Sequence, residues 1–145
     1  MLISKEALPD VEVGFMNDTH DEDRIIINGI YELILKYEKK PSDNNKENIN
    51  VLYQKWFNHT VDHFNNEEIR MRETNFPAYE LHKVEHDKVL AIMHEVFSAW
   101  QHGSDISVLK NYFVEILPLW IIQHIETMDI VTAHFFNTGE ISCAI

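Results

Sequence analysis

Histidines and carboxylates at helical spacing constrain this chain more than any other feature. They form four clusters, each on a different stretch of helical apolar periodicity: His20; His63 with Glu67; His82 with His86; and His124 with Asp129. Residues four apart share one face of a helix, so each middle cluster can present two ligands to one cavity. The last pair, five apart, is turned by about 140° on a regular helix, which favours a binuclear site over one small ion. The clusters therefore predict four helices around one binuclear metal centre.

Apolar residues recur every three to four positions through most of the chain, which has only 4 glycines and 4 prolines. The pattern predicts an irregular N-terminal arm over residues 1–17, a bundle over about 18–136 and a short C-terminal tail. We expect a single all-α domain over residues 1–145, folded as an antiparallel up-down four-helix bundle. In such a bundle all four clusters fall in the same half, at a rise of about 1.5 Å per residue.

Residues that cap or break helices predict where each helix begins and ends. The expected boundaries are Thr19 and Lys39 for the first helix, Ser42–Asn44 and Thr74–Asn75 for the second, Pro77 and Gly103 for the third, and Ser104 or Asp105 for the start of the fourth. Pro118 lies inside the fourth helix, where it removes a backbone hydrogen bond and is expected to kink the chain.

Charge and cysteine content exclude several classes of function. The net charge of −12 argues against nucleic acid or anionic lipid as a partner. We see no signal peptide and no apolar run near the roughly 20 residues of a membrane helix. The single cysteine, Cys143, cannot form an internal disulfide, which favours a reducing compartment. We therefore expect a soluble, cytoplasmic protein with no membrane or nucleic-acid partner.

The ordered set H…HxxxE…HxxxH…HxxxxD resembles the hemerythrin family, specifically the single-domain bacteriohemerythrins. The resemblance runs from about Val13 to Phe136 and includes HFNNEE, a short NFP turn before HxxxH, and LWIIQHI at Leu119–Ile125. It implies a non-haem diiron centre: two Fe ions bridged by carboxylates and a solvent-derived oxo or hydroxo group. It also implies reversible O2 binding, as in an oxygen carrier, storage or delivery protein rather than an enzyme, with an oxygen-consuming enzyme as a client.

The resemblance assigns a role to each residue of the site. One iron would be bound by His82, His86 and His124. The other would be bound by His20 and His63 and would keep an open coordination position. The two irons would be bridged by Glu67 and Asp129. The apolar O2 pocket would be shaped and closed by Phe64, Trp120 and Ile121.

Three residues near these ligands need separate comment. Asn17 stands where bacterial relatives commonly have an acidic residue, so the hydrogen-bonding support of His20 is expected to differ. His59, one turn from His63, is interpreted as a core histidine or a support for the ligands rather than an extra ligand. Glu68 is expected to be solvated.

Three alternative functions compete with the oxygen carrier. A sensor of O2, redox state or nitric oxide, acting through a separate partner, would keep the same site. A diiron oxidase of the ferritin type would use Glu-x-x-His pairs, which the sequence lacks. A zinc peptidase would use the inverted motif HKVEH at 82–86, with Glu85 as general base. The peptidase leaves the other three clusters unexplained.

Overall fold

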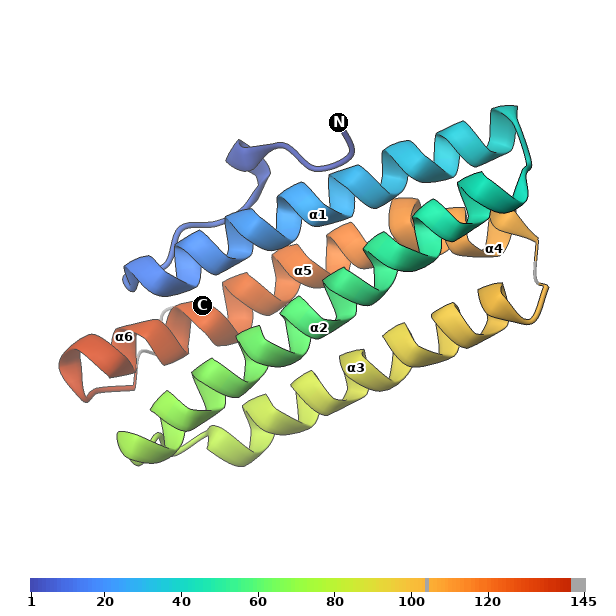
Figure 1. The fold of residues 1–145 in the computed structure, drawn as a ribbon. Coiled ribbons are helices and arrows are strands. Elements are labelled where there is room, and N and C mark those ends of the chain that lie inside the picture. Colours follow the sequence, from blue (N-terminus) through green and yellow to red (C-terminus); the bar gives the residue numbers. More distant parts are fainter. Residues whose placement is uncertain (104, 142–145) are drawn as a thin grey trace.

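Four helical segments pack side by side and run alternately up and down in the computed structural model, which describes residues 1–103 and 105–141 (Figure 1). The first three are α1 (Gly14–Lys39), α2 (Asp43–Glu73) and α3 (Tyr79–Gln101). The fourth consists of α4 (Ile106–Asn111), the π-helical turn η2 (Tyr112–Ile116), α5 (Leu117–His124), the π-helical turn η3 (Ile125–Asp129) and α6 (Ile130–Thr138). The expected all-α, up-down four-helix bundle is confirmed.

Two helices begin elsewhere than the sequence predicted. α1 begins at Gly14, so the irregular arm is shorter than residues 1–17 and contains one 3-10 turn, η1 (Lys5–Ala7). Thr19 does not cap this helix, because its hydroxyl donates to the carbonyl of Phe15 one turn earlier (2.8 Å). α3 begins at Tyr79, and Pro77 lies in the turn before it rather than in its first turn.

The other boundaries follow the capping residues identified from the sequence. Side-chain oxygens of Ser42 and Asp105 accept backbone N–H groups at the starts of α2 and α4. Gly103, with a φ of +94°, follows the end of α3 and adopts a backbone conformation that favours glycine. Ser104 and Cys143 lie outside the described residues.

A large apolar core fills the half of the bundle near the α1–α2 loop. Its most enclosed side chains come from all four segments: Ile30, Ile34, Ile49, Tyr53, Met93, Leu109 and Phe113. The hydroxyl of Tyr53 donates to the carbonyl of Met93 (2.8 Å), which satisfies a polar group inside this core. Burial of this apolar surface supplies the main favourable term for folding and fixes the helices that carry the clusters.

The fourth segment differs from the sequence-based expectations in its apolar length and in its geometry at Pro118. By length and composition alone, the stretch Ile106–Thr138 could cross a membrane, although no apolar run of that length was expected from the sequence. Core helices of soluble proteins share this length and composition, and here the stretch buries His124 and Asp129 in the bundle. At Pro118 the expected disturbance takes the form of η2, which interrupts the regular helix just before the proline.

Candidate metal centre

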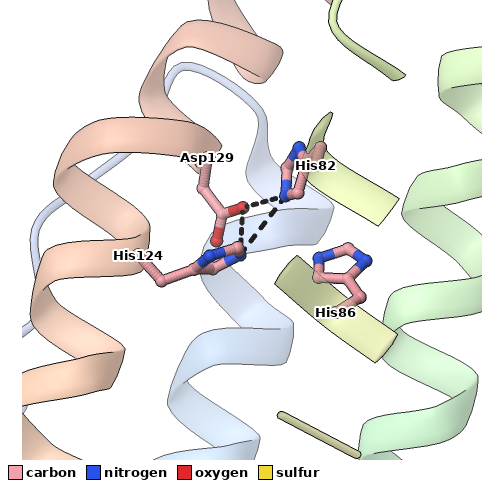
Figure 2. A group of neighbouring side chains, drawn as sticks. All are labelled: His82, His86, His124 and Asp129. Carbon is pink, nitrogen blue, oxygen red and sulfur yellow. Dashed lines mark hydrogen bonds and ion pairs between the residues drawn. The ribbon is translucent and has the colours of Figure 1, made fainter. Parts of the chain in front are cut away.

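Seven buried side chains converge in the half of the bundle opposite the large core. The potential ligand atoms form two groups, each lying within 4.8 Å of one another: His82, His86, His124 and Asp129; and His20, His63 and Glu67. All four helical segments contribute, and Figure 2 shows the first group, with Asp129 facing the imidazoles of His82 and His124. The structure thus brings together every residue that the sequence singled out as a ligand.

Asp129 lies between the two groups. Its Oδ1 is 3.1 Å from Nε2 of His82 and 3.1 Å from Nε2 of His124, both in the first group. Its Oδ2 is 2.9 Å from Nε2 of His20, in the second group. One carboxylate therefore presents one oxygen to each group.

Glu67 repeats this arrangement from α2. Its Oε2 lies 2.6 Å from Nε2 of His63, in its own group. Its Oε1 faces the other group, 3.4 Å from Nε2 of His86 and 3.7 Å from Nε2 of His82. Two carboxylates placed in this way have the geometry that a double bridge between two cations requires.

The turn η3 explains how His124 and Asp129 reach the same cavity. On a regular α-helix a spacing of five would turn the two side chains about 140° apart. A π-helical turn closes with an i→i+5 hydrogen bond, so residues five apart come onto nearly the same face. The spacing that was attributed, from the sequence, to the size of the centre is therefore accommodated by local helix geometry.

Oxygen atoms behind the imidazoles orient three of the five histidines. The Nδ1 contacts are His82 with Thr132 (2.8 Å), His86 with Glu68 (2.9 Å) and His63 with Asp23 (2.8 Å). In each case Nε2 is left facing the centre, and such contacts fix the tautomer and plane of a ligating imidazole.

Sequence reasoning missed these supporting residues. Glu68, expected to be solvated, is only 8% exposed and pairs with His86, so that prediction was wrong. Asp23 and Thr132 carried no signal beyond their helical register, because their partners lie on other helices. The side-chain amide of Asn17 is hydrogen-bonded to the arm instead: its oxygen accepts from the backbone N–H of Val11 and its nitrogen donates to the carbonyl of Val11.

Two aromatic rings stack on histidines of the first group. Phe64 stacks on His86 with ring centroids 3.8 Å apart, and Trp120 stacks on His124 at 4.6 Å. The indole N–H of Trp120 also donates to Glu85 (3.0 Å). Glu85, the general base of the peptidase alternative, therefore serves here as an acceptor that orients Trp120.

A small cavity of about 40 Å³ adjoins the centre, lined by His20 and His63 of the second group and by His124 and Asp129 of the first. Phe64, Trp120 and Ile121 all lie along its wall, where a ligand pocket was expected from the sequence. The cavity is larger than the roughly 10–15 Å³ that one water requires, so a ligand of one or two heavy atoms fits. Its lining is mainly apolar, with side chains from the arm closing one side.

The charges of neighbouring buried side chains shift the pKa values of Glu67 and His63. Burial and the charge of Asp129 would raise the pKa of Glu67, but pairing with His63 lowers it from 4.5 to about 2. Burial would lower the pKa of His63, but the charge of Glu67 and the hydrogen bond to Asp23 raise it well above 6.5. Glu67 is thus held as an anion in the core, where it needs positive charge nearby, either a protonated His63 or a cation in the place of that proton.

Three buried atoms at the centre indicate what supplies that charge. Among the described residues, Glu67 Oε1, Asp129 Oδ1 and His86 Nε2 make no hydrogen bond, although they are shielded from solvent; the same is true of the Nδ1 atoms of His20 and His124. Buried polar atoms without partners are costly, and these three lie among the candidate ligands: Glu67 Oε1 is 3.4 Å from Nε2 of His86, and Asp129 Oδ1 is 3.1 Å from Nε2 of His82. Imidazole nitrogen and carboxylate oxygen together suit iron and zinc, so the residues fit a pair of divalent cations.

Comparisons with known proteins agree with this geometry. No family model matches the chain. It is 29% identical to a bacteriohemerythrin of Aquifex aeolicus, over 92% of this chain and 96% of that protein. It is 34% identical to one of the hemerythrin subunits of Sipunculus nudus, over 61% of this chain and 63% of that one. The fold is similar to a crystal structure of wild-type hemerythrin, with a TM-score of 0.73, 20% identity and coverage of 95% and 98% of the two chains.

Proposed function

Because the chain belongs to the hemerythrin family, we propose that it binds O2 reversibly at a diiron centre and acts as an oxygen carrier, storage or delivery protein. One observation carries this proposal: each of two buried carboxylates presents one oxygen to each of two histidine groups, next to an apolar cavity. The site has more neutral imidazoles than carboxylates, which stabilises highly oxidised iron poorly and favours binding of O2 over its cleavage.

In this proposal each iron has its own histidines and shares the carboxylates. One would be held by His82, His86 and His124, the other by His20 and His63, with Glu67 and Asp129 shared. When bound, the two ions supply the position at which O2 binds and the electrons that it takes up. Both groups border the cavity, but the second offers fewer side-chain ligands, so the open position is assigned there.

The side chains around the cavity make binding reversible by excluding water. Phe64, Leu117 and Ile121 line it with hydrocarbon, and Trp120 closes it beside His124. A dry wall hinders the entry of water and protons that would otherwise drive bound O2 towards irreversible reduction. Hydrogen bonds behind His63, His82 and His86 keep the imidazoles in place while O2 enters and leaves.

Anaerobic titration of the reduced, iron-counted protein with O2, followed by argon purging, tests this function. We expect a visible absorption band that appears with O2, disappears on purging, and requires two irons per chain. Direct and irreversible conversion to the oxidised spectrum would reject the carrier and favour a redox sensor or an oxidase.

A further inference from the structure

We propose that Asp23 is a positioning residue for the metal centre: braced by His59, its carboxylate holds the His63 imidazole with Nε2 facing the bound cation. The proposal rests on the proposed function only in taking His63 as a ligand. From the sequence, Asp23 had no expected role and His59 was expected to be a core or supporting histidine.

The carboxylate of Asp23 divides its two oxygens between two imidazoles. Its Oδ2 lies 2.8 Å from Nδ1 of His63, and its Oδ1 lies 2.7 Å from Nδ1 of His59. A carboxylate only accepts hydrogen bonds, so both Nδ1 atoms carry protons. On His63 this leaves Nε2, 2.6 Å from Glu67, as the nitrogen directed into the centre.

His59 braces Asp23 from the outer side. Its Nε2 contacts Glu22 at 2.8 Å, so both ring nitrogens of His59 face carboxylate oxygens and the ring is held as an imidazolium. The hydrogen bond to Asp23 raises the pKa of His59 to about 9, against the effect of partial burial. Asp23 is thereby fixed by an ion pair on one side while it orients His63 on the other.

This brace is suited to a ligand rather than to an ordinary core histidine. The side chain of Asp23 is 14% exposed and that of Glu22 is 62% exposed, so the contacts run from the surface to a ligand that is 7% exposed. A charged acceptor at Nδ1 makes His63 a stronger electron donor than a neutral acceptor such as Thr132 makes His82. Asp23 therefore strengthens cation binding at the second group and favours its more highly charged state.

Zn²⁺ binding by the full-length, metal-free protein tests the proposal, measured by competition with a chromophoric chelator. We expect Asp23→Asn to weaken one of the two Zn²⁺ sites roughly 10–100-fold, the usual effect of losing such a partner. His59→Gln, which keeps Asp23 but removes its brace, should weaken the same site less. The matched control is Asp62→Asn, which removes the same charge from an exposed position next to His63 and should leave both sites unchanged.

Two results of this experiment would overturn the proposal. One is wild-type Zn²⁺ affinity at both sites in Asp23→Asn. The other is an equal loss in Asp62→Asn, because the effect would then come from charge and not from the contact with His63. Circular dichroism of each metal-free variant shows whether it is folded before binding is measured.

A measurement on the wild-type protein decides the question even if Asp23→Asn does not fold. Long-range ¹H–¹⁵N spectra of the Zn²⁺-loaded protein report which nitrogen of His63 carries the proton; we expect Nδ1, with Nε2 bound to the metal. The reverse assignment would overturn the proposal. Since Zn²⁺ is redox-inert, this result stands apart from the O2 titration, and either proposal can fail without the other.

Discussion

Among the individual residues, His124 contacts both a carboxylate and another histidine of the candidate ligand set. Its Nε2 lies 3.1 Å from Asp129 and 3.3 Å from Nε2 of His82, and its ring is stacked by Trp120. We expect His124→Ala to lose one iron per chain and to melt at a lower temperature in the presence of iron, because metal binding to a buried site is coupled to folding. Iron counting and thermal unfolding with and without iron measure this.

The control for His124→Ala is the same substitution at His94, an exposed histidine on α3. His94→Ala should keep two irons and the melting temperature of the wild type. Full iron occupancy in His124→Ala would reject His124 as a ligand.

Ile121 tests the role of the apolar wall. It borders the cavity, whereas Leu119, a side chain of equal size on the same helix, is 65% exposed. We expect Ile121→Ala to shorten the lifetime of the oxygenated form by admitting water, and Leu119→Ala to leave it unchanged. The decay of the absorption band in air measures the lifetime; equal lifetimes for the Ile121 variant and the wild type would place Ile121 outside the functional pocket.

Among the helical elements, η3 makes a prediction about chain length. Deletion of the exposed Thr127 should convert this π-helical turn into a regular turn, leaving His124 and the aspartate four apart and still on one face. Deletion of the exposed Asn65 from the regular helix α2 should instead rotate Glu67 by about 100° relative to His63.

We therefore expect the Thr127 deletion to retain two Zn²⁺ sites and the Asn65 deletion to lose them, as measured by chelator competition. Equal losses in the two deletions would show that the extra residue in η3 is required and that regular helix geometry cannot replace it.

The start of α4 makes a prediction about pH. The backbone hydrogen bond from Ser107 lowers the pKa of Asp105 below its ordinary 3.8. Because the pKa is lower in the folded state, the stabilisation is present above pH 3.8 and is lost as pH falls through the folded-state value. We expect the difference in melting temperature between wild type and Asp105→Ala, both metal-free, to narrow as pH falls below 3.8. A constant difference would argue against a charged cap.

In the molecule as a whole, the large apolar core and the candidate metal centre lie in different halves of the bundle. Ile34 is completely buried in the large core on α1, far along the helix from His20, while Ile25 on the same helix is 57% exposed. We expect Ile34→Ala to lower the free energy of unfolding by about 2–5 kcal/mol, and Ile25→Ala to change it by less than about 0.5 kcal/mol.

Urea unfolding of the metal-free variants measures these differences, and both should still bind two Zn²⁺ ions when folded. Loss of a Zn²⁺ site in folded Ile34→Ala would show that packing in the large core also determines the geometry of the centre.

The class of fold and the side chains that meet in the bundle could be predicted from the order of residues. Apolar periodicity predicted four helices, and the histidines and carboxylates four apart on them were expected to face one interior, because the helical repeat fixes which residues share a face. Residues such as Ser42 and Gly103 predicted helix ends through local backbone chemistry. These features depend on neighbours close in the chain, so the sequence alone encodes them.

Two features could be found only in the folded chain: the residues that hydrogen-bond to Nδ1 of the ligand histidines, and the placement of His124 and Asp129 on one face of their helix. Asp23, Glu68 and Thr132 meet their imidazoles across gaps between helices, at separations along the chain that no periodicity specifies. The turn η3 and the cavity likewise arise where the fourth segment packs against the other three. Contacts between helices depend on their relative shift and rotation, which side-chain packing fixes only once the bundle is assembled.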